Sequence, residues 1–118
     1  MTGHGTLNFL IEAVTVDCYN DAEQATAFHT VFTEEVRLPA TASLLGHAVT
    51  VLQIEVGEDG RSLVARCTSG ANERWLALTE LEFPADRPAA WLHAAYLRSL
   101  GLTPYTYAMP DGWKPDWL

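Results

Sequence analysis

The stretch NDAEQATAFHTVFTEEVRLP, residues 20–39, decides the fold of this 118-residue chain. Asn20 and Asp21 are favourable N-cap residues for a helix. Apolar side chains then recur at helical spacing and form one face, at Ala25, Phe28, Val31, Phe32 and Val36. Pro39 cannot continue a helix, because it lacks an amide hydrogen and its ring clashes with the carbonyl four residues earlier. The stretch therefore predicts an amphipathic helix over about residues 19–36.

C-terminal to this helix, the hydrophobic period changes from helical to alternating, which predicts β-strands. Gly46 and the turns GEDG at 57–60 and SGAN at 69–72 separate the apolar runs, and a bulge or bend is expected near Leu52. The expected strands are residues 40–45, 47–56, 62–68, 73–78 and, at an edge, 79–83. Short strands joined by tight turns predict a small, bent antiparallel sheet that closes into an SH3-like barrel.

The two ends of the chain complete the predicted α+β architecture. Leu7–Val16 alternates weakly and is expected to form a short strand or an irregular lead-in. A second amphipathic helix is predicted from Pro88 to a stop at Gly101. We expect one domain over residues 1–102, followed by a tail over 103–118 that is rich in proline and aromatic residues. Half of the chain's tryptophans lie in this tail, so it is expected to pack on the domain or on a second subunit.

The bulk composition predicts a soluble protein. The chain is 48% hydrophobic and 19% charged, which is ordinary for one globular domain. No apolar run approaches the roughly 20 residues that span a bilayer, and residues 1–10 lack the features of a signal peptide. We therefore expect a cytoplasmic location and no membrane partner. In that compartment Cys18 and Cys67 are expected to be reduced thiols.

The net charge of −8 is concentrated in one half of the sequence. Residues 1–60 hold nine acids and one base, whereas residues 61–118 hold six of each. A negative field of this kind repels phosphate backbones, which argues against nucleic-acid binding. It attracts cations and basic protein surfaces, although a simple solubilising face would have the same composition.

Catalytic motifs are absent from the sequence. There is no Gly-x-Ser-x-Gly elbow, no glycine-rich phosphate loop, and no pair of histidines or cysteines at zinc-ligand spacing. His29 falls beside the apolar stripe of the first predicted helix and is interpreted as a half-buried structural histidine. Cys67 lies within a predicted strand and is interpreted as a buried structural thiol. We therefore expect no catalysis, with a small enzyme or accessory subunit as an alternative.

Calcium chemistry needs six to eight hard oxygens, and the acidic half supplies carboxylates. No EF-hand loop is present, because no Asp-x-Asp-x-Asp-Gly run appears. Glu34 and Glu35 are placed at the C-terminal end of the first predicted helix, where they oppose the helix dipole and a bound cation would relieve the repulsion. The full set of candidate metal ligands is Glu34, Glu35, Asp17, Asp21, Glu23, Glu58 and Asp59.

Three segments together resemble a small bacterial calcium-binding family, the CcbP-like proteins of cyanobacteria. They are Asp17-x-Tyr19-x(3)-Glu23-Gln24-x(3)-Phe28, Glu34-Glu35-x(2)-Leu38-Pro39, and Leu45-Gly46-x(2)-Val49-x-Val51-x(2)-Ile54. The resemblance covers roughly residues 11–100 and leaves the aromatic tail outside. It implies an acidic helix packed on a small SH3-like sheet, and calcium binding in buffering or signalling. It points to Glu34 and Glu35, and then to the acids around residues 17–23. Ala40 departs from the pattern, since an aromatic residue often stands there in the family.

The sequence thus predicts a calcium-binding protein that uses surface carboxylates. The alternative is a non-catalytic interaction module of the same fold that has lost the metal. Such a module would engage a basic protein through the acidic helix, or a partner or second copy through the tail aromatics, Tyr105, Tyr107, Trp113 and Trp117.

Overall fold

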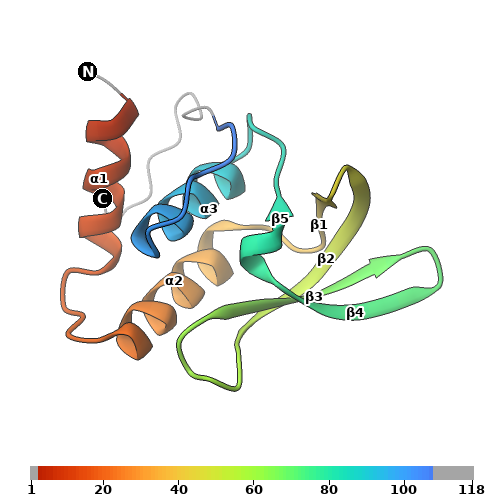
Figure 1. Ribbon diagram of the computed structural model, residues 1–118, viewed down its shortest axis with the longest axis horizontal. Coiled ribbons are helices and arrows are strands. Elements are labelled where there is room, and N and C mark those ends of the chain that lie inside the picture. Colours follow the sequence, from red (N-terminus) through yellow and green to blue (C-terminus); the bar gives the residue numbers. More distant parts are fainter. Residues whose placement is uncertain (1–2, 108–118) are drawn as a thin grey trace.

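The structure is a computed structural model that describes residues 3–107, with side chains from residue 7 onward. It is an α+β protein with three α-helices and a five-stranded antiparallel sheet (Figure 1). The helices are α1 (Gly3–Val14), α2 (Asp21–Glu35) and α3 (Pro88–Ser99). The strands are β1 (Ala40–Leu44), β2 (His47–Val56), β3 (Leu63–Ser69), β4 (Asn72–Ala77) and β5 (Leu81–Glu82), with a 3₁₀ turn at Leu78–Glu80.

The sheet is open, so the predicted barrel is not found. Its order is β4-β3-β2-β1-β5, with every neighbouring pair antiparallel. After β4 the 3₁₀ turn carries the chain back across the sheet, and β5 then pairs with β1 through two residues, Ser43 with Glu82 and Leu44 with Leu81. Because β5 adds at the far edge, β4 is left as the other edge and the two edges do not meet. The bulge predicted near Leu52 is confirmed, because the pairing of β2 with β3 shifts between Val51 and Gln53.

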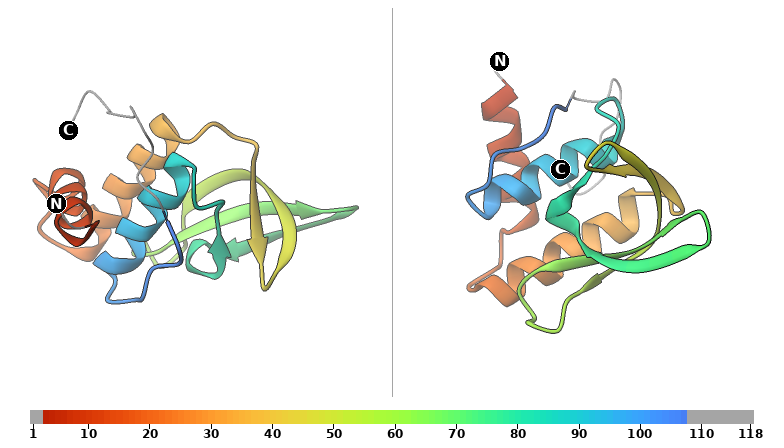
Figure 2. Two further views of the ribbon diagram at one scale, coloured as in Figure 1. Left: turned by 90° about the horizontal axis from the view of Figure 1, so that it is seen from above. Right: turned by 45° about the vertical axis from the view of Figure 1, so that its right-hand side comes forward.

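The helices lie on one side of the sheet, and α1 is the farthest from the strands (Figure 2). The helix α2 lies on β2 and on α3, and α1 packs mainly on α3. Most of α3 is buried, from Ala89 to Leu97, because it lies between the other two helices and the sheet. The largest fully buried side chains of this core are Tyr96, Phe28, Phe32, Leu7, Leu10, Leu63, Leu78, Leu81, Leu92, Leu97 and Val51.

The N-terminal segment is a helix, so the expectation of a strand or an irregular lead-in was wrong. Leu7, Leu10 and Val14 lie on the buried side of α1, at helical spacing. Phe9 created the apparent alternation, yet its side chain is 59% exposed. Burial of this face against α3 stabilises the helix, and the i, i+3, i+7 spacing of the three residues was the local signal for it.

Tyr96 joins α3 to both the sheet and α2. Its ring makes edge-on contacts with Phe28 and Phe32, with centroids 5.5 and 6.4 Å apart. Its hydroxyl accepts a buried hydrogen bond of 2.8 Å from the Leu63 amide at the start of β3. Burial raises the pKa of this hydroxyl, with Asp59 adding to the rise, so it remains protonated at neutral pH.

The chain after α3 begins with Gly101, whose φ of 78° makes it the predicted C′ glycine. Tyr105 stacks on His93, with centroids 6.0 Å apart, and Tyr107 packs against the core. The rest of the aromatic tail, including Trp113 and Trp117, lies outside the described residues. Over residues 3–107 no helix is long and apolar enough to cross a membrane.

Candidate metal centre

The seven candidate carboxylates fall at three places in the fold. Asp21 and Glu23 lie in the first turn of α2, with Asp17 in the connection that precedes it; Glu34 and Glu35 lie at the C-terminal end of α2, and Glu58 and Asp59 in the β2–β3 turn. A rise of about 1.5 Å per residue separates the two ends of α2 by roughly 20 Å, so these acids cannot share one ion. Within residues 3–107 no three His, Cys, Asp or Glu side chains group in a way that could hold a metal ion.

The acids at the N-terminal end of α2 support the local fold. Asn20 caps the helix by accepting a 2.8 Å hydrogen bond from the Glu23 amide, and the Glu23 carboxylate accepts one of 2.7 Å from the Tyr19 amide. The two hydrogen bonds tie the residues before the helix to its first turn, and Asp21 also favours the positive end of the helix dipole. Burial raises the pKa of the Cys18 thiol, with smaller contributions from Glu23 and Asp17. Because Glu23 accepts the hydrogen bond from the Tyr19 amide, one of its carboxylate oxygens is already engaged by the backbone.

Asp59 organises the β2–β3 turn. Its carboxylate accepts hydrogen bonds from the amides of Arg61 and Ser62, at 2.9 and 3.1 Å, and from the Ser62 hydroxyl, at 2.8 and 3.0 Å. These donors lower the pKa of Asp59, led by the Arg61 amide. Both carboxylate oxygens are engaged in the turn, while the neighbouring Glu58 is exposed.

The acids at the C-terminal end of α2 have a different setting. Glu34 is exposed and Glu35 is half-buried, at the end where backbone carbonyls point out of the helix. No basic residue lies in the last turn to balance the negative end of the dipole. Glu35 lines a cavity of about 380 Å³ beneath this end, together with Arg37 and Arg87. Two adjacent carboxylates and a helix C-terminus are hard oxygen ligands of the kind that calcium takes.

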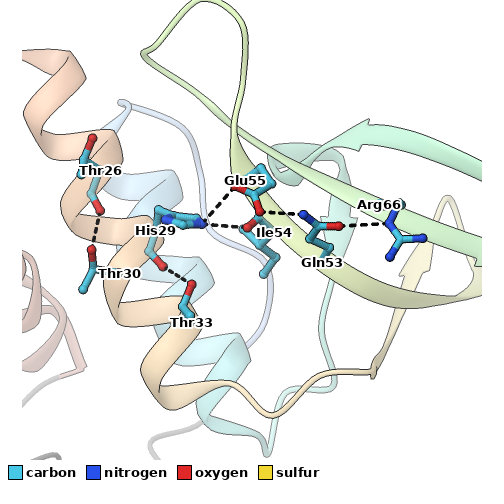
Figure 3. Close-up of polar contacts among 8 residues, drawn as sticks. All are labelled: Thr26, His29, Thr30, Thr33, Gln53, Ile54, Glu55 and Arg66. Atoms are coloured by element: carbon cyan, nitrogen blue, oxygen red, sulfur yellow. Dashed lines mark hydrogen bonds and ion pairs between the residues drawn. The ribbon is translucent and has the colours of Figure 1, made fainter.

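A polar network on the sheet uses one further acid, Glu55, that the sequence did not single out (Figure 3). His29 of α2 lies 2.8 Å from the Ile54 carbonyl oxygen and 3.6 Å from the Glu55 carboxylate. Gln53 donates to Glu55 at 2.7 Å and accepts from Arg66 at 3.2 Å. His29 is thus the structural histidine that was predicted, and Glu55 is committed to joining α2 to the sheet.

The structure also brings the start of α2 close to the β2–β3 turn, which is distant in sequence. Asp21 of α2 lines a cavity of about 250 Å³ with Arg61 of the β2–β3 turn and with Tyr96 of α3. No local pattern links residues 21, 61 and 96, because their proximity depends on how α2 packs across the sheet. Arg61 places a positive charge in this cavity beside Asp21.

Comparison with solved structures identifies the fold. The chain superposes on the crystal structure of Anabaena CcbP with a TM-score of 0.70 and 16% identity, over 87% of this chain and 97% of that one. A calcium binding protein in its calcium-binding form gives a TM-score of 0.64 and 15% identity, over 87% of this chain and 99% of that one. This chain has the CcbP fold. No family model and no curated protein sequence matches the chain.

The fold expected from the resemblance is therefore confirmed, except for closure of the barrel. The shared fold extends beyond the residues that carried the resemblance, since nearly the whole of both solved structures is covered. At this level of identity the likeness establishes the arrangement of helices and strands, and the ligands must be argued from this chain's own residues.

Proposed function

We propose that this protein binds calcium at the C-terminal end of α2, through the carboxylates of Glu34 and Glu35. The observation that carries the proposal is this adjacent acidic pair, placed against the helix dipole in a fold shared with calcium-binding proteins. Backbone carbonyls of the last helical turn and water would complete the hard oxygen shell.

The other candidate carboxylates are subordinate in this proposal. Asp59 and Glu23 already accept hydrogen bonds from the backbone, and a metal would have to displace those donors. Asp21 lies at the positive end of the α2 dipole, which opposes a cation, and Asp17 lies apart from it in the connection between α1 and α2. Glu58 is exposed beside Asp59 and would offer one carboxylate to a second, weaker site.

The proposed site is one of low affinity. Affinity for calcium rises with the number of charged ligands and with the rigidity of the site. Two carboxylates on a surface helix end place the dissociation constant at about 10⁻⁴ to 10⁻³ M, the range of weak modules. Such a site suits calcium buffering where the ion is abundant. The absence of catalytic activity stays a prediction.

The experiment is a calcium titration of ¹⁵N-labelled, metal-free protein. We expect saturable shifts at the amides of residues 33–37, and smaller responses to magnesium, which demands a stricter octahedral geometry. The double substitution Glu34→Gln and Glu35→Gln should abolish these shifts. Glu58→Gln, an exposed acid in the β2–β3 turn, is the matched control and should leave them unchanged. Shifts that survive the double substitution would locate calcium elsewhere and contradict the proposal.

Calcium should also stabilise the fold by mass action. With a dissociation constant near 1 mM, 10 mM calcium adds about 1.4 kcal/mol to the free energy of unfolding. Thermal unfolding with and without calcium measures this gain, and the double glutamine variant should lose it. An equal gain with magnesium or with a matched ionic strength would indicate screening of the acidic half instead.

A further inference from the structure

The helices leave one end of the sheet uncovered, where the β1–β2 and β3–β4 turns lie away from them (Figure 2). The helix-facing side of β2 and β3 is covered around Ile54 and Leu63, where α2 and α3 pack. At the other end the same side forms a groove of about 260 Å³, which we call the sheet groove. Its lining residues are Leu44, Leu45, His47, Val49, Cys67, Thr68, Ser69, Asn72, Arg74 and Leu76.

The strand register explains the chemistry of the sheet groove. Residues paired across antiparallel strands point to the same side, so Cys67 and Arg74 share the face that carries Val51. Val49 and Cys67 form a buried apolar floor, and Leu44 and Leu76 are half-buried at its sides. Trp75 alternates to the opposite face, where it lies beside Arg66. The sheet groove is therefore an extension of the core face that no described helix covers.

Leu45 at the tip of the β1–β2 turn is not explained by the fold. Its side chain is 91% exposed, and its φ of 51° lies in the left-handed region that disfavours a leucine. Asn or Gly usually fills this position of a tight hairpin, because both adopt positive φ at little cost. A large apolar side chain held there, on the rim of an apolar groove, suits a ligand that covers it.

The charge of the sheet groove is opposite to that of the chain. The chain carries −8, whereas the groove is lined by Arg74 and His47 and by no carboxylate. Among the described residues no ion pair joins Arg74 to an acid, while the neighbouring Arg66 pairs with Glu73 at 2.7 Å. The sheet groove is thus the place where a carboxylate of a ligand would find an available guanidinium.

The edge of the sheet beside the groove is free. β4 pairs with β3 alone, so its outer backbone amides and carbonyls have no strand partner among the described residues. Extended peptides add to such edges through backbone hydrogen bonds, and adjoining pockets select alternate side chains. A peptide added to β4 would place every second side chain on the face of Arg74 and Leu76.

We propose that the sheet groove binds an extended segment of a partner protein, which pairs with β4 and presents apolar side chains and one carboxylate to the groove. The apolar side chains would contact Leu45 and Leu76, and the carboxylate would pair with Arg74. This surface is separate from the calcium site at the end of α2, so the two proposals stand or fall independently.

The test uses a blocked heptapeptide, Thr-Leu-Thr-Glu-Thr-Leu-Thr, whose inner face as a strand is Leu, Glu, Leu. Added to the ¹⁵N-labelled full-length protein, it should give saturable shifts at Leu45, Val49, Cys67, Arg74 and Leu76. Peptides with Gln or Lys at the centre should bind at least tenfold more weakly. Arg74→Glu should reverse this preference, so that the Lys peptide binds best.

Leu45→Asn separates binding from folding. Asn adopts positive φ readily, so this variant should unfold at a higher temperature than the parent while its affinity for the Glu peptide falls at least fivefold. Trp75→Thr, on the opposite face of the same strand, is the matched control and should keep the affinity. Weaker binding with the expected gain in stability supports the proposal.

Three results would overturn it. The first is the absence of saturable shifts with the Glu peptide at millimolar concentration. The second is a dimer in sedimentation that Leu45→Asn dissociates, which would make a second copy the occupant. The third is movement of the Leu45 and Arg74 amides on Trp113→Ala or Trp117→Ala without any peptide, which would make the chain's own tail the occupant.

Discussion

At the N-terminal end of α2 the acids hold the backbone, whereas at its C-terminal end they oppose it. The Glu23 carboxylate accepts from the Tyr19 amide, and Asp59 in the β2–β3 turn accepts hydrogen bonds from Arg61 and Ser62. Glu34 and Glu35 sit where the helix dipole is negative and no basic residue occupies the last turn. The acidic half of the sequence is therefore not a single metal site, because its carboxylates lie at separate places in the fold. A carboxylate whose oxygens already accept backbone hydrogen bonds is less available to a metal, and the field of the helix dipole favours a cation only at the C-terminal end.

The largest effect on stability is expected at the buried hydrogen bond that follows the Asp59 turn. Tyr96→Phe removes the hydroxyl that accepts from the buried Leu63 amide, immediately after the Asp59 turn. An unsatisfied buried amide costs about 1–3 kcal/mol, and urea unfolding should show a loss of that size. Tyr105→Phe is the matched control, because that side chain is 41% exposed and should change stability little. An unchanged urea midpoint for Tyr96→Phe would mean that water replaces the hydroxyl.

A smaller loss is expected at the cap of α2. Asn20→Ala removes the acceptor for the Glu23 amide and should lower the free energy of unfolding by about 1 kcal/mol. Asn20→Asp keeps a capping oxygen and should recover most of that loss. Thermal unfolding measures both variants. Equal losses for alanine and aspartate would show that the cap is not the source of stability at this end.

The opposite sign is expected at the other end of the helix. Without calcium, Glu34→Gln with Glu35→Gln removes two charges that oppose the dipole, so stability should rise by a few tenths to about 1 kcal/mol. Calcium should cancel the difference, since it stabilises only the parent. Urea unfolding of the parent and of the double variant, each with and without calcium, gives the four free energies of unfolding that this comparison needs. A loss of stability in the metal-free variant would break the comparison between the two ends.

The smallest effect at neutral pH is expected for Asp59→Asn, because asparagine can keep the same turn. The hydrogen bonds in the turn lower the pKa of Asp59 below its usual 3.8. The native state therefore binds this proton less readily than the unfolded state does, and stability is lost as the pH falls below about 3.8. The variant should lose less stability between pH 5 and pH 2. Parallel pH profiles for the two proteins would contradict a structural role for this carboxylate.

The sequence was sufficient for the parts of the fold that local pattern controls. The helical spacing of Phe28 and Phe32, the bulge near Leu52 and the helix stop at Gly101 were each predicted and found. The interpretation failed at α1, where Leu7, Leu10 and Val14 recur at helical spacing but the exposed Phe9 gave the segment a weak alternation. It failed again at closure of the sheet, because nothing local shows that β5 would pair with β1 rather than beside β4.

The candidate ligands divide in the same way, into those whose role the local sequence explains and those whose role only the fold explains. The sequence identified an acidic half and the adjacent Glu34 and Glu35. It did not show which carboxylates would be engaged in hydrogen bonds of the fold itself. The engagement of Glu23 by a backbone amide follows from a capping pattern that is readable in sequence. The engagement of Glu55 beside His29 does not, since it depends on a contact between α2 and β2.

By itself the sequence determined α2, α3 and the strands β1 to β4 to within about two residues, the uneven distribution of charge and the lack of catalytic motifs. These depend on spacing and composition within a few residues. The edge strand expected over residues 79–83 was only partly right, because Leu78–Glu80 forms a 3₁₀ turn and the strand is limited to Leu81–Glu82. Tertiary structure alone decided the packing of α1 on α3, the position of β4 as an edge of the sheet formed by residues 40–82, and the presence of Leu45 and Arg74 in one groove. Such features depend on which distant surfaces bury each other, and burial is settled only when the whole chain has folded.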